Sequence, residues 1–107
     1  MIREIQLKDK EQWEKLYRGY ADFYKVEMNN KILYTVWNWL HDKKHEVNGL
    51  VCEIDDNIVG FAHYRKMPRP LAGQDIGFLD DLFVDPKYRG QKIGEKFINQ
   101  MKEISKI

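Results

Sequence analysis

The sequence has few of the features that mark secreted, membrane or nucleic-acid-binding proteins. Its 107 residues contain one cysteine, Cys52, which excludes an internal disulfide and suits a reducing compartment, so we expect a cytoplasmic protein. No apolar run approaches the length of a membrane span, and the first residues lack the apolar core of a signal peptide. A net charge of +1 gives no electrostatic footprint for nucleic acid. We therefore expect neither a membrane nor a nucleic acid as partner.

What is present is typical of one globular domain over residues 1–107. Apolar residues make up 43% of the chain and charged residues 33%, a balance that favours a packed soluble fold over disorder. The histidines His41, His45 and His63 have no cysteine or carboxylate at the spacing of metal ligands, so no metal site is expected. Cys52 is interpreted as a small core residue, because no activating base is near it in sequence.

Hydrophobic periodicity predicts seven elements in the order strand, helix, helix, strand, strand, strand, helix. The first strand covers residues 2–7, and Asp9 with Gln12 is predicted to cap the helix that follows. The second helix starts at Asn29 and Asn30. Strands are predicted over residues 47–54, 58–65 and 78–84, and residues 67–73 form a loop because they contain two prolines and a glycine. Gly60 inside a strand indicates a bulge or a close backbone approach.

Residues 78–94 organise the rest of the chain. Pro86 ends the apolar strand over 78–84, and Gly90 and Gly94 stand at the start of a helix with a regular apolar stripe. A turn that opens a helix presents free N–H groups and the positive end of the helix dipole, and Arg89 adds a cation suited to phosphate oxygens. These features predict an anion cradle, although a turn with two glycines also occurs for purely conformational reasons.

The order of residues Arg89-Gly90-Gln91-Lys92-Ile93-Gly94, after Leu82-Phe83-Val84-Asp85-Pro86, resembles the acetyl-CoA signature of the GNAT superfamily of N-acetyltransferases. Lys92 stands where the family usually has a middle glycine, and a lysine is expected to have an ordinary backbone conformation there. Residues 47–106 are also similar to the diamine (polyamine) acetyltransferase branch, through Ile58-Val59-Gly60-Phe61-Ala62 and the strand 78–84.

The resemblance implies an α/β (α+β) GNAT fold with a mainly antiparallel sheet, of which this chain holds the N-terminal part. The family continues with further strands and a helix, so the chain looks truncated after its third helix. The strand 78–84 would then keep an open edge, which predicts a homodimer or completion of the sheet by another chain.

The resemblance also implies that the chain transfers an acetyl group from acetyl-CoA, as cosubstrate, to a primary amine, with a small amine or polyamine favoured. The residues that it places around acetyl-CoA lie at the end of the strand and the start of the helix: Leu82, Phe83, Val84, Arg89, Gly90, Gln91, Lys92, Ile93, Gly94, Glu95 and Lys96.

Asp80 and Asp81 are the predicted catalytic residues. Two adjacent carboxylates interrupt the alternation of the strand, which indicates a bulge. By resemblance Asp80 occupies the position of the branch's glutamate base, so it is the first candidate for the general base, acting through a water. The alternative is that both aspartates only cap or solvate the strand. Tyr24, Glu27 and Tyr34, near the link between the two helices, and His63, on a strand beside the presumed pocket, are the predicted acceptor contacts, with core packing as the alternative.

Three functions remain open from the sequence. The chain is an acetyl-CoA-dependent N-acetyltransferase, a CoA-binding but catalytically incomplete fragment, or an interaction module that binds no nucleotide. Binding of CoA separates the third from the other two, and turnover separates the first from the second.

Overall fold

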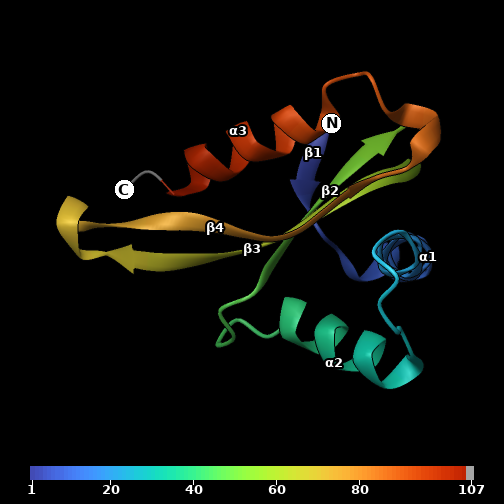
Figure 1. Cartoon of the computed structure of the whole chain (residues 1–107), viewed down its shortest axis with the longest axis horizontal. Coiled ribbons are helices and arrows are strands. Elements are labelled where there is room, and N and C mark those ends of the chain that lie inside the picture. The colour runs from blue at the N-terminus through green and yellow to red at the C-terminus, as the bar shows by residue number, and fades with distance from the viewer. Residues whose placement is uncertain (106–107) are drawn as a thin grey trace.

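The computed structural model describes residues 1–105, which form a four-stranded antiparallel sheet with helices on both faces (Figure 1). The strands pair in the order β1-β2-β3-β4. The elements are β1 (Ile2–Glu4), α1 (Lys10–Phe23), α2 (Asn30–Leu40), β2 (Asn48–Ile54), β3 (Asn57–Arg69), β4 (Gln74–Val84) and α3 (Ile93–Ser105). The predicted order and the antiparallel sheet are both confirmed. Within these residues, no helix has the length and apolar character needed to cross a membrane.

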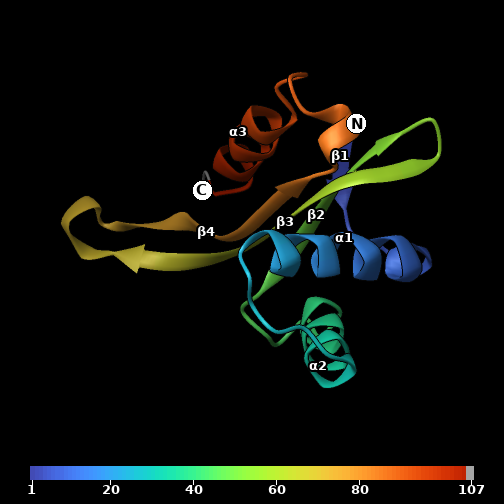
Figure 2. The same ribbon diagram turned by 45° about the vertical axis from the view of Figure 1, so that its right-hand side comes forward.

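The sheet lies between α3 on one side and α1 and α2 on the other (Figure 2), and each side holds an apolar core. On one face, α1 and α2 pack Trp13, Leu33 and Trp37 against Phe61 of β3. On the other face, α3 packs its predicted stripe, Ile93, Phe97 and Met101, against the alternate residues of the strands. Because side chains alternate across a strand, a single sheet supplies both cores, and β4 runs between them.

The helix caps differ in part from the sequence prediction. Asn29 caps α2 as expected, because its Oδ1 accepts the N–H of Ile32 at 2.9 Å. Asp9 does not cap α1. Its carboxylate accepts two hydrogen bonds from the guanidinium of Arg3, at 2.8 and 2.9 Å, and one from the N–H of Gln6. A bidentate, charge-assisted hydrogen bond to a guanidinium is stronger than a hydrogen bond to a helix-capping N–H, which explains why the capping prediction was wrong.

β3 and β4 are longer than predicted and form a two-stranded arm beyond the rest of the sheet, on the left of Figure 1. The predicted loop over 67–73 shrinks to a 3-10 turn over Pro70–Ala72 and Gly73, whose φ is +62°. Pro68 is accommodated because β2 pairs with β3 only as far as Tyr64, so the outer part of β3 is an edge on that side.

Gly60 allows the close approach that its position predicts. A Cβ atom there would lie 3.1 Å from the carbonyl oxygen of Phe83 and 3.2 Å from the Phe97 ring. The β2–β3 register also shifts next to it, because Cys52 pairs with Gly60 whereas Glu53 pairs with Ile58, which leaves Val59 as the extra residue. The bulge and the missing side chain let α3 lie against the end of β4.

Candidate functional site

The predicted anion cradle is the segment between β4 and α3. Asp85 accepts the N–H of Lys87 through its side chain and begins a 3-10 turn over Pro86–Tyr88. Gly90 then has a φ of +89°, and α3 begins at Ile93. Because the first N–H groups of a helix have no intrahelical acceptor, those of α3 point out of its start together with the positive end of its dipole.

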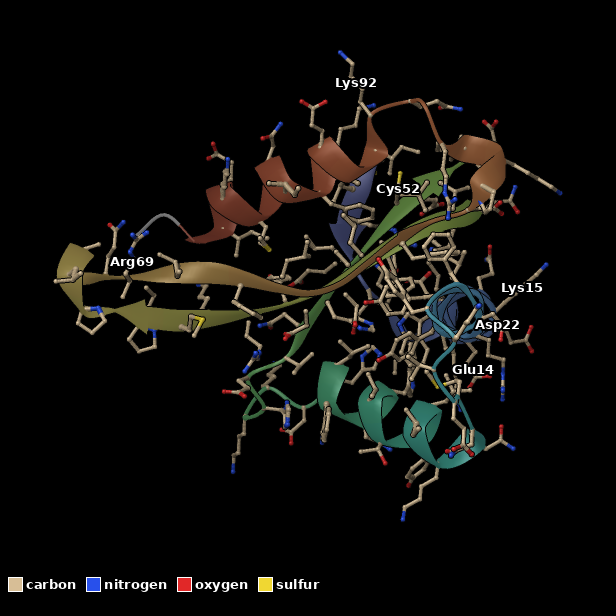
Figure 3. The ribbon with its side chains drawn as sticks, viewed as in Figure 1. Glu14, Lys15, Asp22, Cys52, Arg69 and Lys92 are labelled. Carbon is tan, nitrogen blue, oxygen red and sulfur yellow. The ribbon has the colours of Figure 1, made fainter. Side chains whose placement is uncertain are left out.

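Lys92 has a φ of +59°, in the left-handed region. The expectation of an ordinary backbone there was wrong, and the reason is geometric. The 3-10 turn over Pro86–Tyr88 and the start of α3 at Ile93 fix the ends of a short link, which holds position 92 in the left-handed region at a cost of about 1 kcal/mol for a residue with a Cβ. The Lys92 side chain points away from the body of the protein (Figure 3).

The cradle is open to solvent. Residues 89–92 are exposed, and only Ile93 turns inward, where it is 3% exposed in the α3 core. A Cβ atom placed on Gly90 would meet no heavy atom of residues 1–105 within 4 Å. These residues therefore leave room for a diphosphate against the start of α3, and the free N–H groups there suit its charge.

Arg89 is tied to the end of β4. Its Nε donates to the carbonyl oxygen of Val84 at 3.1 Å, and its guanidinium lies 5.5 Å and 5.4 Å from the ring centroids of Phe23 and Phe83. The residue therefore joins α1, β4 and the loop. The predicted contact of Arg89 with phosphate stays a prediction.

At the other end of the site, β4 carries the predicted bulge. His63 pairs with Asp81 and Tyr64 pairs with Leu79, so Asp80 is the extra residue. In a regular strand, neighbouring side chains point to opposite faces. The extra residue cancels that alternation, and both Asp80 and Asp81 line the same cleft. The bulge that the sequence predicted is confirmed.

The cleft has a volume of about 320 Å³ and lies where the end of α2, the start of β2, β3 and β4 meet. Three carboxylates and one guanidinium line it, together with aromatic and apolar side chains. The lining residues are Tyr17, Val36, Trp39, His45, Glu46, Val47, His63, Arg65, Asp80 and Asp81. The ring of Trp39 stacks on His45 with centroids 4.6 Å apart. A cleft with an excess of carboxylates beside aromatic rings suits a cationic ligand.

Asp81 is the half-buried carboxylate of the cleft. Its Oδ2 lies 2.8 Å from Nδ1 of His63 and accepts the Tyr17 hydroxyl at 3.3 Å. Burial taken by itself would raise the pKa of Asp81, but the hydrogen bonds from His63, Tyr20 and Tyr17 outweigh it and hold the pKa below its usual range. Asp81 is therefore an anion throughout the physiological pH range.

Asp80 has a different environment. Both of its oxygens accept from Arg65, at 2.9 to 3.2 Å, and Arg65 also lies 3.5 Å from Glu46. The hydrogen bond with Asp80 raises the pKa of Arg65. The guanidinium therefore neutralises much of the charge on Asp80. Among the described residues, Asp81 has no ion-pair partner other than the His63 ring. The prediction that puts Asp80 first as base stays a prediction.

The structure brings together only part of the predicted acceptor set. His63 lines the cleft, but it is 1% exposed and each of its nitrogens has a protein partner. Tyr24, Glu27 and Tyr34 are exposed and lie outside the lining of the cleft. Sequence reasoning missed Tyr17, Trp39, Glu46 and Arg65. No sequence signal joined these four residues, which come from separate segments of the chain.

Comparison with known proteins identifies the family of the chain. Residues 12–106 match the model of the Acetyltransferase (GNAT) family. The D-amino-acid N-acetyltransferase of Saccharomyces cerevisiae is 29% identical over 101 residues, which are 92% of this chain and 62% of that protein. An uncharacterised N-acetyltransferase of Methanocaldococcus jannaschii is 31% identical over 93 residues, 86% of this chain and 40% of that protein. The chain thus spans less than two thirds of the length of these curated relatives.

Solved structures show the same fold. A ribosomal-protein-alanine N-acetyltransferase from Brucella melitensis superposes with a TM-score of 0.76 at 23% identity, over 96% of this chain and 69% of that one. AAC(6')-Iy, solved in complex with a bisubstrate analogue, superposes with a TM-score of 0.77 at 16% identity, over 96% of this chain and 69% of that one. By its match over nearly all of its length, the chain belongs to the GNAT acetyltransferase family.

Proposed function

We propose that this chain binds acetyl-CoA at the start of α3 and directs its acetyl group to a primary amine held in the carboxylate cleft. The observation that carries the proposal is the placement of both sites on β4. The anion cradle follows Val84, and Asp81 lies three residues earlier, about 10 Å along the strand. A cosubstrate lying along the strand from the cradle would therefore bring its acyl end toward the cleft.

In this proposal the chain's own groups have distinct tasks. The N–H groups over residues 89–94, with Glu95 and Lys96 beside them, hold the diphosphate, and the main chain of Leu82, Phe83 and Val84 pairs with the extended arm of the cosubstrate. Acetyl-CoA supplies a thioester, which an amine attacks at the carbonyl carbon. The C–N bond forms, the C–S bond breaks and the thiolate leaves, while the amine loses a proton to water.

Asp81 supports this step as a fixed anion. A carboxylate with a lowered pKa is a weak base, so Asp81 binds and orients the acceptor ammonium, and water takes the proton that the ammonium must lose before its nitrogen can attack. The geometry thus favours Asp81 over Asp80, whose oxygens are both bound by Arg65.

The class of amine follows from the charge of the cleft. The cleft lining has three negative charges, on Glu46, Asp80 and Asp81, and one positive charge, on Arg65. This excess of negative charge supports an acceptor with more than one ammonium group, such as a polyamine. Arg65 supports a second candidate. If it left Asp80, its planar cation could bind the carboxylate of an amino acid, the acceptor class that the yeast relative's name gives for that protein.

Turnover with a panel of acceptors tests the proposal. We expect acetyl-CoA-dependent acetylation of polyamines to exceed that of D- and L-amino acids of equal chain length. The variant Arg65→Gln should leave polyamine acetylation within a few-fold of wild type, but it should abolish amino-acid acetylation if that class is the true acceptor. Binding of CoA without turnover of any amine would favour the incomplete fragment, and failure to bind CoA would favour an interaction module.

We also propose that the open edge of β4, before the residues that pair with the cosubstrate, pairs either with a second copy of this chain or with another chain. The single cysteine, buried and free, is consistent with action in the cytoplasm.

A further inference from the structure

A buried hydrogen-bond chain connects the core of α1 to Asp81. Nε1 of Trp13 lies 2.9 Å from Nε2 of His63, and Nδ1 of His63 lies 2.8 Å from Oδ2 of Asp81. Trp13 is fully buried and His63 is 1% exposed, so no solvent reaches the ring nitrogens. The chain runs from inside the molecule to the wall of the cleft.

The chemistry of the indole decides where the protons lie. An indole nitrogen only donates, so Nε2 of His63 must accept and cannot carry a proton. A neutral imidazole then has its proton on Nδ1, and that N–H donates to Asp81. Turning the ring over would place carbon atoms against both partners and leave the Trp13 N–H unpaired in the core, which is costly. The orientation and the tautomer are therefore both fixed.

Packing holds the same geometry. The His63 ring meets Tyr17 edge-on, with centroids 4.9 Å apart, and lies 4.7 Å from Phe61. Asp81 is the acidic group that faces the ring, and Tyr17 donates to the same carboxylate oxygen. Oδ2 is thus occupied from inside the protein, which leaves the outer side of the carboxylate for the cleft.

We propose that Trp13 is a positioning residue, which keeps His63 neutral so that Asp81 presents a full negative charge to the acceptor amine. The proposal rests on the proposed function and deepens it. An imidazolium at His63 would cancel the charge of Asp81, and a ring with its proton on Nε2 would take away the hydrogen bond from His63 to Oδ2, leaving Tyr17 as its donor. The indole N–H excludes both states.

Nitrogen NMR of the free protein, with its histidine rings isotopically labelled, tests the chain without any turnover. We expect His63 to show a protonated, slowly exchanging Nδ1 and an unprotonated Nε2. In Trp13→Phe, which keeps an aromatic ring but lacks the donor, this fixed tautomer should be lost. Trp37→Phe is the matched control: its ring lies 5.1 Å from Trp13 in the same core, outside the cleft lining, and the wild-type pattern should persist.

A protonated Nε2 in the wild-type protein would overturn the proposal, even if Trp13→Phe did not fold. A Trp13→Phe spectrum identical to that of wild type would overturn it as well. In the assay, Trp13→Phe should raise the KM for the amine about tenfold and leave the KM for acetyl-CoA unchanged, as expected for a weakened charged contact. An intact tautomer in a protein that acetylates no amine would contradict the proposed function, and with it the role of Asp81 toward an amine, while the hydrogen-bond chain from Trp13 to Asp81 would still be confirmed.

Discussion

Lys92 has the backbone conformation of a glycine although it carries a side chain. The signature resemblance located this position but could not give its conformation, because a lysine in isolation disfavours a positive φ. The conformation is imposed by the neighbours: the turn over Pro86–Tyr88 and the start of α3 at Ile93 fix the two ends between which the chain must reverse. The segment between β4 and α3 thus holds a small backbone strain at Lys92.

The strain at position 92 is measurable by comparing two truncations. Lys92→Gly and Lys92→Ala both remove the side chain, but only glycine adopts a positive φ without penalty. We expect Lys92→Gly to have a free energy of unfolding about 1 kcal/mol higher than Lys92→Ala in urea titrations. Equal stabilities, or a more stable alanine variant, would show that position 92 has an ordinary backbone.

Asp80 and Asp81 show how a sequence can reveal a pair without assigning its roles. Their adjacency predicted the bulge, and the bulge brings both to one cleft. Their roles depend on distant partners: Arg65 binds Asp80, whereas His63 and Tyr17 bind Asp81. Nothing in the order of residues near the pair indicates which partner reaches which carboxylate.

Substitution by asparagine separates the two carboxylates. We expect Asp81→Asn to lower kcat/KM for the amine about a hundredfold, because it removes the unpaired charge of the cleft. Asp80→Asn should lower kcat/KM for the amine less than Asp81→Asn does, since Arg65 already neutralises the Asp80 carboxylate. Circular dichroism of both variants checks that the fold is kept. A larger loss in Asp80→Asn than in Asp81→Asn would restore the order of roles predicted from the sequence.

At the scale of elements, α1 places a row of phenols against the sheet. Tyr17 and Tyr20 pack on Phe61, with ring centroids 5.4 Å and 5.9 Å away, and both lie near Asp81. Burial is the main cause that raises the pKa of both tyrosines, and the nearby Asp81 carboxylate is the second. The pKa of Tyr20 rises to about 12, and that of Tyr17 rises well above its usual value. Burial likewise raises the pKa of Tyr64 in β3.

These shifts predict a loss of stability at alkaline pH. A raised pKa in the folded state means that the fold favours the neutral phenol. The stabilisation is complete below the ordinary tyrosine pKa of about 10 and disappears as the pH rises toward 12 and beyond. We expect the urea midpoint to fall over this range, and phenolate absorbance from these tyrosines to appear only as the protein unfolds.

The variant Tyr20→Phe provides the control for this pH dependence. Removing one titrating phenol should make the alkaline fall in the urea midpoint shallower. If all six tyrosines ionised together near pH 10 in the folded protein, the burial argument would be refuted.

Elements were easier to predict than the cleft between them. The inward stripe of α3, the bulge at Asp80 and the close approach at Gly60 all follow from local spacing, and the structure confirms each. The cleft instead collects Trp39, Glu46 and Arg65 from three separate segments. Such a set depends on the register between β2, β3 and β4, which spacing along the chain does not determine.

At the scale of the whole molecule, the two faces of the sheet carry different parts of the candidate site. The face covered by α1 and α2 holds the carboxylate cleft, and α3 on the other face supplies the anion cradle. β4 lies at the edge of the sheet formed by the described residues, so its outer backbone groups have no neighbouring strand. The arm adds exposed apolar side chains, with Leu71 fully exposed at its tip.

Self-association through the β4 edge can be distinguished from contacts at the tip. Light scattering at micromolar concentration should report a dimer for the wild-type chain. Ile76→Lys places a charge on β4 and should shift the mass to that of a monomer, whereas Leu71→Lys, at the tip, should not. A monomeric wild-type chain, or a dimer broken only by Leu71→Lys, would contradict pairing through the edge.

The most direct test of the account is a calorimetric titration of CoA against wild type and two variants at Gly94. A Cβ atom at Gly94 meets Leu82 at 3.7 Å, an ordinary contact, so both variants should fold. We expect Gly94→Ala to bind CoA as wild type does. Gly94→Asp suits a helix start but places a carboxylate where the diphosphate would lie, so its CoA binding should be lost. Equal CoA binding by Gly94→Asp and wild type would contradict the cradle.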